Sequence, residues 1–459
     1  MTKKALFLTL APLLAFALSG GAQPPPAAPA QPAAPPQQPS EIGATITSGA
    51  IGAPPKYAVP DFIPLTTDPE TEAAARTIGH VLWDDLNFEE EFYMIPRDTY
   101  QTVPAAHGFT DVPFADWAQL GADAVVVGTI ARDGTNFHVQ VRLFNIRTQQ
   151  SVFGREYTGP TTNPRFFAHT ISDEIFKQQR GLRGVARTKI AFASDRDAER
   201  MPGFVPDRRV KEIYISDYDG ANQRRVTVGR TLNITPAWAP DDQSIAYTSY
   251  RLGVPEIFRS FIYRGTIAQM THGPSQSFLP AWSPDGKQIA FMSDRDGHDN
   301  IYIMNADGTG LRELTHGSSI NATPTWSPSG TEIAFTSDRS GSPQIYVIGV
   351  DGLGLRRLTS ESYCDRPTWS PAPYNEIAYA SRTGPGFDIK ILDLETGKIR
   401  QITFGQGSNE SPSFAPNGRH LAFVSTRTGH SEIFTIGRDG KGLRQITTKG
   451  SNYFPNWSN

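Results

Sequence analysis

The fold is decided by a phrase that recurs through the second half of the chain. One copy reads PAWSPDGKQIAFMSDR at residues 280–295, followed by NIYIMNADG at 300–308 and LRELT at 311–315. Its aromatic anchor recurs at Trp238, Trp282, Trp326, Trp369, Phe414 and Trp457. The intervals of 43 to 45 residues accommodate four short strands with their turns, which is typical of one blade of a β-propeller.

Turn residues divide each copy into four strands. Ser-Pro-Asp-Gly after Trp282 and the Asp307-Gly308 pair are turn formers, and the segments 288–293 and 301–305 between them are rich in apolar residues. Successive residues of a strand point to opposite sides, and residues 301–305 are apolar on both sides. A blade that packs between two neighbouring blades requires such a strand.

The two ends of the repeat region predict six blades. The first copy has second, third and fourth strands at 189–195, 212–216 and 225–227, but no Pro-x-Trp strand before them. The segment Pro455-Asn-Trp457-Ser supplies one such strand without the other three. We expect it to complete the first blade, because this closes the ring and leaves no open sheet edge.

The region before the repeats mixes helix and strand signals. Asp68-Pro69 is a helix start, and apolar residues follow it at the spacing of one helix face. Residues 124–130 and 137–146 are β-rich and joined through a hairpin signal, and residues 151–158 could add a third strand. Asn163-Pro164 predicts a further helix that ends at Gly181. We expect a small α/β domain here.

The N-terminus has the pattern of an export signal. Lys3 and Lys4 precede an apolar run that ends at Leu18, and small residues before Gln23 resemble a signal-peptidase site. The next segment is almost wholly Pro, Ala and Gln, which is typical of a disordered tether. The predicted division is a signal peptide at 1–22, the tether at 23–40, an α/β domain at 41–183 and an all-β six-bladed β-propeller at 184–459.

Composition excludes several classes of protein. The chain has 43 Lys and Arg against 46 Asp and Glu, without a long basic run, so nucleic acid is not an expected partner. The single cysteine, Cys364, cannot form an intramolecular disulfide or a thiolate cluster, and is expected to be a buried small hydrophobe. No later segment is a candidate transmembrane helix, so the mature protein is expected to be soluble.

Catalytic and metal chemistry find little support. A hydrolase fused to such a propeller needs a G-x-S-x-G elbow, which is absent. His169 and Asp173 lie four apart on a predicted helix, but two ligands are too few for a metal, so we interpret them as a helix-surface pair. The loops beginning at Asp217 and Asn305 lack the twelfth-position Glu of a calcium loop. No catalytic residue, metal or cofactor is predicted.

A Ser-Asp-Arg triplet recurs in three blades. Its Asp-Arg pairs are Asp195-Arg196, Asp294-Arg295 and Asp338-Arg339. A residue that returns with the repeat is more often part of the blade architecture than of one active site, so the triplet is interpreted as structural.

Two sets of residues resemble a known family. The phrases PAWSPDG and IAFxSDR resemble the TolB-type propeller repeat, which other proteins also use. The segment HTISDEIF at 169–176, followed by residues 184–191 and DYDGANQ at 217–223, is similar to TolB proteins where their α/β domain meets the propeller. The domain order is also that of TolB proteins.

The resemblance implies a role in the Tol-Pal envelope system. TolB proteins are periplasmic, bind the outer-membrane lipoprotein Pal and are linked to the inner-membrane Tol complex, which supports outer-membrane integrity and constriction during division. It also implies a non-enzymatic, monomeric protein that reaches membranes through its partners only. The family's N-terminal partner-binding element would fall at residues 41–51. A periplasmic small-molecule or glycan binder that uses the propeller channel is the alternative.

Strand direction predicts where a partner binds. The loops from each outer strand to the next inner strand emerge on one face, and they vary in sequence while the strands repeat. In the family the Pal-binding face is formed by matching loops, with Leu279 and Ala322 at matching positions. The predicted partner-binding residues are Ser277, Phe278, Leu279, Ser319, Asn321, Ala322, Tyr363, Asp365, Asn409, Glu410, Asn452 and Tyr453.

Overall fold

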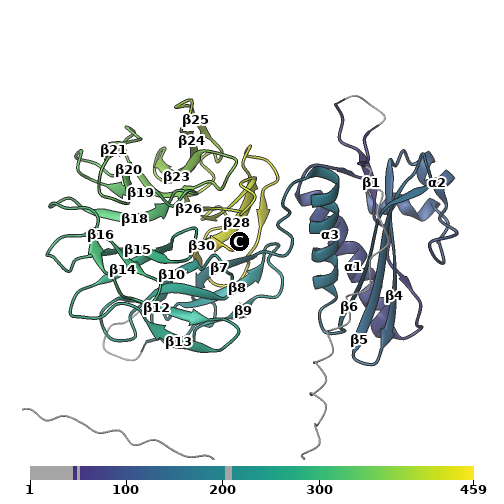
Figure 1. The fold of residues 1–459 in the computed structure, drawn as a ribbon, viewed down its shortest axis with the longest axis horizontal. Helices are drawn as coiled ribbons and strands as arrows, with labels where there is room; N and C mark the ends of the chain where they lie inside the picture. Colours follow the sequence, from purple (N-terminus) through teal and green to yellow (C-terminus); the bar gives the residue numbers. More distant parts are fainter. Residues whose placement is uncertain (1–44, 49–51, 202–208) are drawn as a thin grey trace, which may run out of the picture. The chain divides into compact units, whose positions relative to one another are not determined.

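The computed structural model describes residues 45–48, 52–201 and 209–459 (Figure 1). The predicted signal peptide and tether lie outside the described residues, as does most of the segment 41–51. Both predicted folds are present: a mixed α/β domain, and a six-bladed β-propeller after it. None of the helices in the described ranges has the length and apolar character of a membrane span.

The α/β domain is built on one mixed sheet with the order β3-β1-β4-β5-β6, and β2 pairs with β4. The pairs β1–β3, β1–β4 and β2–β4 are parallel, and β4, β5 and β6 form an antiparallel meander. The strands are β1 (Lys56–Ala58), β2 (Ile63–Pro64), β3 (Tyr93–Met94), β4 (Ala124–Asp133), β5 (Asn136–Asn145) and β6 (Gln150–Pro160). The helices are α1 (Pro69–Phe88), η1 (Arg97–Thr102), α2 (Phe114–Gln119) and α3 (Pro164–Arg180).

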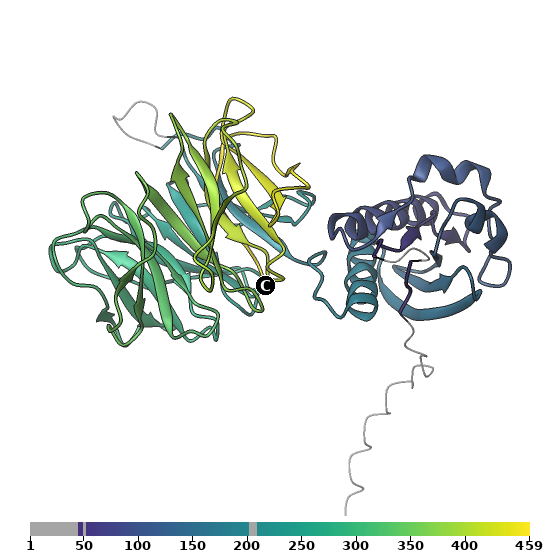
Figure 2. The same cartoon turned by 90° about the horizontal axis from the view of Figure 1, so that it is seen from above.

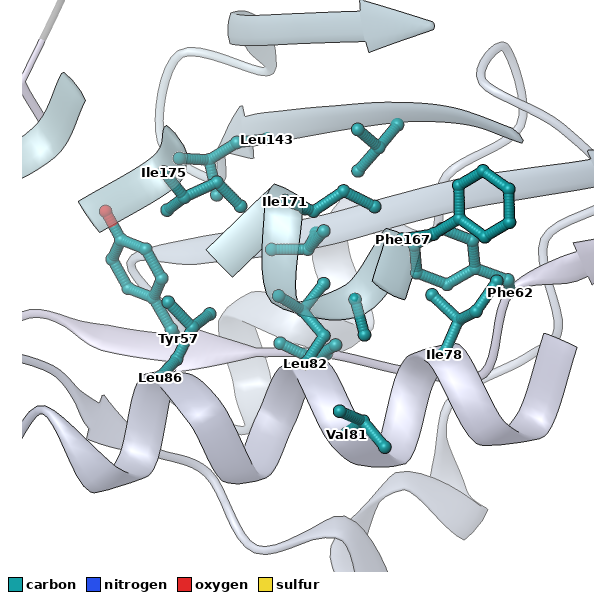
Figure 3. Close-up of a cluster of buried hydrophobic side chains, with 14 of the residues drawn as sticks. Tyr57, Phe62, Ile78, Val81, Leu82, Leu86, Leu143, Phe167, Ile171 and Ile175 are labelled. Atoms are coloured by element: carbon teal, nitrogen blue, oxygen red, sulfur yellow. The ribbon is translucent and has the colours of Figure 1, made fainter. Parts of the chain in front are cut away.

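Capping residues define the start of α1 and the end of α3. The Asp68 carboxylate accepts a hydrogen bond from the Thr71 amide at 3.0 Å, with Pro69 in the first turn. Gly181 ends α3 in the left-handed conformation, φ +67°. Apolar residues on the inner faces of both helices pack together on the sheet, among them Leu82 and Ile171 (Figure 3). This packing fixes the orientation of α3.

The propeller has six four-stranded antiparallel sheets, each in chain order except the first (Figures 1 and 2). Blade 1 has the order β30-β7-β8-β9, so the last strand of the chain pairs with the first propeller strand, and Trp457 lies opposite Ile190. The predicted closure of the ring is therefore confirmed. Blades 2 to 6 are β10–β13, β14–β17, β18–β21, β22–β25 and β26–β29.

The strand bounds follow the repeat. The inner strands are β30 (Asn452–Trp457), β10 (Asn233–Trp238), β14 (Ser277–Trp282), β18 (Asn321–Trp326), β22 (Cys364–Trp369) and β26 (Asn409–Phe414). The second strands are β7 (Lys189–Ser194), β11 (Ser244–Ser249), β15 (Gln288–Ser293), β19 (Glu332–Ser337), β23 (Glu376–Arg382) and β27 (His420–Ser425). The third strands are β8 (Glu212–Asp217), β12 (Glu256–Phe261), β16 (Asn300–Asn305), β20 (Gln344–Gly349), β24 (Phe387–Asp393) and β28 (Glu432–Gly437). The outer strands are β9 (Arg224–Arg225), β13 (Thr266–Gln269), β17 (Arg312–Glu313), β21 (Arg356–Arg357), β25 (Ile399–Gln401) and β29 (Arg444–Gln445).

Helices α1 and α3 carry polar side chains that contact the propeller. Asp85 accepts hydrogen bonds from the Tyr218 hydroxyl at 2.7 Å and from His169 at 2.8 Å. Burial lowers the pKa of His169, but the attraction of Asp85 and Asp219 outweighs it, and the pKa is raised overall. His169 is only 5% exposed, so its interpretation as part of a helix-surface pair is wrong: Asp85 of α1 and the Tyr218 ring of blade 1 contact it.

Glu89 and His420 meet at the same domain junction. Glu89 accepts the Val185 amide at 2.9 Å and the Asn417 side chain at 3.2 Å, and burial raises its pKa to about 8. His420 stacks on Phe88 with ring centroids 4.1 Å apart and donates to the Phe88 carbonyl at 3.1 Å. Burial lowers the pKa of His420 to about 3.

Candidate partner-binding face

One face of the propeller carries all the loops that lead from an outer strand to the next inner strand. These loops are residues 226–232, 270–276, 314–320, 358–363, 402–408 and 446–451. The turns between second and third strands, which contain the Ser-Asp-Arg triplets, emerge on the same face because adjacent strands are antiparallel. We call this surface the partner face.

The aspartates of the triplets hold these loops in place. Asp294 accepts a hydrogen bond from the Gln276 amide at 2.7 Å, and Asp338 accepts one from the Ile320 amide at 2.9 Å. Asp195 accepts the Ser451 amide at 2.7 Å across the ring closure. Each carboxylate therefore satisfies a loop N–H that the strands leave unpaired. The structural role that the repeat predicted for the triplet is therefore a specific one: its Asp binds a loop amide.

The triplet arginines lie over the aromatic residues of their own blade. Arg339, for example, lies over the rings of Phe335 and Tyr346, 5.4 and 5.1 Å from their centroids. Its guanidinium also donates to Ser337 at 2.9 Å and to Asn321 at 2.6 Å. Each triplet arginine therefore joins aromatic and polar side chains of its own blade next to the partner face.

Ten of the twelve predicted partner-binding residues lie at the start of inner strands and two, Ser319 and Tyr363, lie in loops. Four of the ten are fully buried: Ser277, Asn321, Asn409 and Asn452. Asn409 donates to Asp388 of the preceding blade at 3.0 Å and accepts from Arg427 of its own blade at 3.0 Å. Asn452 likewise donates to Glu432 at 2.7 Å. The three asparagine side chains link neighbouring blades, whereas the Ser277 hydroxyl contacts Ser293 and Arg295 of its own blade.

The other eight predicted residues are partly exposed on the partner face. They are Phe278, Leu279, Ser319, Ala322, Tyr363, Asp365, Glu410 and Tyr453. Several form aromatic contacts at the surface: the Phe278 ring lies 6.4 Å from that of Tyr250, and the Lys211 ammonium lies 4.0 Å from the Tyr453 ring centroid. The structure thus places these residues around one surface.

A small concave mouth opens at the centre of this face. One residue of each inner strand has a left-handed backbone, with φ between +50° and +57°, and precedes a proline. The six are Thr235, Leu279, Thr323, Arg366, Ser411 and Phe454. They line a cavity of about 120 Å³. The pairing between each inner strand and the second strand of its blade shifts register at these residues, as in a β-bulge. Such a shift re-aims the side chains, here toward the channel.

Sequence reasoning missed several residues of this surface. Arg366 and Phe454 occupy the same repeat position as Leu279, just before the proline, so the repeat register alone could have identified them. Val228, Ile320 and Phe404 are exposed to 74%, 50% and 72% in the loops of this face. Their exposure depends on packing, which the sequence does not show.

The opposite end of the channel is wider. Its cavity of about 800 Å³ is lined by the aromatic anchors of the six inner strands, by prolines and by the interdomain segment around Arg183. In the described parts of the chain, no group of three or more His, Cys, Asp or Glu side chains is placed to hold a metal ion.

Comparison with known proteins decides the family. Residues 176–459 match the model of the TolB beta propeller domain, and residues 44–152 match that of the TolB amino-terminal domain. The chain belongs to the TolB family. The two family models follow one another in the order that the two folds have in this chain.

Individual TolB proteins resemble this chain over different lengths. The Tol-Pal system protein TolB of Desulfosudis oleivorans is 34% identical over 215 residues, which is 46% of each chain. That of Pseudomonas aeruginosa is 31% identical over 195 residues, 42% of this chain and 43% of the relative. The chain therefore spans about half the length of the curated relatives it matches. These relatives are named as components of the Tol-Pal system, not as enzymes.

A solved structure extends the likeness. The crystal structure of TolB from Acinetobacter baumannii superposes with a TM-score of 0.74 at 27% identity, covering 88% of this chain and 97% of that one. Both domains of this chain are therefore similar to a solved TolB.

Proposed function

We propose that this protein is a non-enzymatic, periplasmic component of a Tol-Pal system, and that its partner face binds a Pal-like lipoprotein of the outer membrane. The observation that carries the proposal is a rigid propeller of the TolB family whose variable loops and half-exposed apolar residues gather around one channel mouth. Recognition surfaces commonly consist of variable loops on a rigid scaffold with a few central anchors.

Leu279→Arg combined with Ala322→Arg tests the binding site. Both side chains are half-buried on the partner face, so two long cations there would obstruct a partner without entering the blade core. We expect the soluble domain of the lipoprotein to show no binding by calorimetry, with circular dichroism and melting temperature close to wild type. A folded double variant that still binds normally would place the lipoprotein elsewhere.

We further propose that the protein links the lipoprotein to the inner-membrane Tol complex through the segment 41–51, and so supports outer-membrane integrity and constriction during division. Ile46 in this segment is buried, and its amide donates to the Gln179 side chain at 2.8 Å. Deletion of residues 41–51 should remove the Tol complex from pull-downs and leave lipoprotein binding intact. Pull-down of the Tol complex by the deleted protein would contradict this assignment.

A small-molecule or glycan binder is the second candidate, because the wide end of the channel is a cavity of about 800 Å³ lined by aromatic residues. If the protein has this function, soluble peptidoglycan fragments should bind in the cavity and raise the melting temperature of the protein. Trp326→Ala should abolish that rise. No shift with fragments, together with tight lipoprotein binding, would rule it out.

A further inference from the structure

Arg366 is the only charged residue among the six that line the channel mouth. The other five present hydroxyl groups, an aliphatic side chain and an aromatic ring. The position is therefore central on the partner face, and its charge is not repeated around the ring. A single charge at the centre of a nearly symmetric surface can fix the orientation in which a partner binds and select partners of complementary charge.

The contacts of Arg366 leave its hydrogen-bond donors available. The guanidinium lies 4.7 Å from the ring centroid of Phe454, on the inner strand of blade 1, and the side chain is 28% exposed. Its Nε is 3.8 Å from Asp365 Oδ2, which is too long for a hydrogen bond. Within the described residues, the guanidinium donates no hydrogen bond to protein.

Asp365 lies beside this group at ion-pair distance, without a hydrogen bond between the two side chains in the described residues. Its Oδ1 already accepts from the Thr336 hydroxyl at 2.9 Å and from the Arg366 amide at 2.7 Å, so this oxygen is engaged by other donors. Among nearby charges, Glu410 accepts from Ser408, and Arg382 lies over Tyr363 and Phe387. The Arg366 guanidinium is thus held by stacking, with its planar set of donors unused.

We propose that Arg366 is a specificity-determining residue that receives the carboxylate of an acidic side chain projecting from the partner protein into the channel mouth. This inference rests on the proposed function, because it assumes that the partner docks on this face. An arginine donates two parallel hydrogen bonds to a carboxylate, and desolvation at the centre of an interface strengthens them. A mouth of about 120 Å³ suits one side chain and not a nucleotide or a sugar chain.

Three variants separate the charge from the stacking. Arg366→Met keeps an apolar stem over Phe454 but removes the donors, and Arg366→Lys keeps the charge without the planar pair of donors. Arg251→Met is the matched control, because Arg251 also lies over an aromatic ring, Phe258, at 5.3 Å on the same face but away from the mouth. Calorimetry with the soluble domain of the lipoprotein, at low and high salt, measures all three.

We expect Arg366→Met to weaken binding on the order of tenfold or more, Arg366→Lys to be intermediate, and Arg251→Met to remain within about twofold of wild type. Melting temperatures should stay near wild type. Acidic residues of the lipoprotein are then replaced by their amides one at a time. One replacement should weaken binding to wild type but have no further effect on Arg366→Met, because the two groups interact directly.

Each alternative result is decisive. If Arg366→Met binds like wild type while Leu279→Arg with Ala322→Arg does not bind, Arg366 has no such role and the proposed function stands. If both variants bind normally, the lipoprotein binds elsewhere, and both the partner face as its site and the role of Arg366 are excluded. If every amide replacement that weakens binding to wild type also weakens binding to Arg366→Met, no acidic side chain of the lipoprotein contacts Arg366. The same conclusion follows if acetate binds at the mouth without competing with the lipoprotein. If Arg366→Met does not fold, wild-type affinity of a folded Arg366→Lys with no change in salt dependence excludes the paired contact.

Discussion

Asp294 shows how one side chain of a blade supports a loop of the partner face. Its carboxylate accepts both the amide and the side-chain nitrogen of Gln276, at 2.7 and 3.1 Å. Without it, the Gln276 amide must find another acceptor. The recurrence of Ser-Asp-Arg predicted a structural role, but the bonded loop could not be predicted, because it is brought close only by the strand pairing.

Asp294→Ala should lower the free energy of unfolding by about 1 to 2 kcal/mol, since a hydrogen bond to a charged acceptor is lost at a partly exposed site. Asp294→Asn keeps one acceptor oxygen and should recover part of the loss. Chemical denaturation measures both. Equal stability of the alanine variant and wild type would show that the contact contributes nothing.

The links between neighbouring blades use a second recurring residue. In four blades an Asn at the start of the inner strand donates to a buried side chain of the preceding blade: Asn233, Asn321, Asn409 and Asn452. Ser277 and Cys364 take this position in the other two. The recurrence of Asn at this repeat position is visible in the sequence and, like that of Ser-Asp-Arg, indicates a part of the blade architecture. Three of these residues, Asn321, Asn409 and Asn452, are also in the predicted partner-binding set, and their burial between blades gives each of them a structural contact.

Asn409→Ala should destabilise the propeller by roughly 2 to 3 kcal/mol, because it leaves Asp388 and Arg427 with one fewer buried partner each. Ser277→Ala, at the matching position of another blade, is the control and should cost less, because Ser277 makes only longer contacts of 3.4 to 3.5 Å. Thermal melts compare the two. A larger loss for Ser277→Ala would contradict the role of the Asn link.

The domain junction should respond to pH through His420. Its pKa of about 3 in the folded protein lies below the usual value of 6.5, so the unfolded state binds a proton that the folded state does not. This contribution to stability is complete above about pH 6.5 and is lost as the pH falls toward 3, by up to about 1.4 kcal/mol per pH unit. Glu89 acts in the opposite sense, since its raised pKa makes stability fall as the pH rises from 4.5 to about 8.

His420→Phe isolates the first contribution. Relative to wild type, the variant should become more stable as the pH falls from about 7 to about 5, whatever constant loss its missing hydrogen bond causes. His272→Phe, at an exposed loop position, is the comparison variant for a histidine outside the domain junction. Parallel melting curves for wild type and His420→Phe at every pH would contradict the buried neutral state of His420.

For the whole molecule, the repeat made the propeller predictable and left the α/β domain less defined. The 43 to 45 residue period and the unpaired last strand predicted six blades and their closure. This was possible because the same turn-forming residues recur at the same places in each repeat. Long elements of the α/β domain were also predicted, including the helix that ends at Gly181. The two-residue strand β3 was not, because tertiary pairing alone defines it.

Amide hydrogen exchange of the protein with and without the soluble domain of the Pal-like lipoprotein tests most directly whether the partner face is the binding site. Local protection by a bound partner reports where it sits. We expect slower exchange in the loops 270–276, 314–320, 358–363 and 402–408 and at the start of the inner strands that follow them, with no change in strands β4 to β6. Protection confined to the α/β domain, with these loops unchanged, would contradict the account.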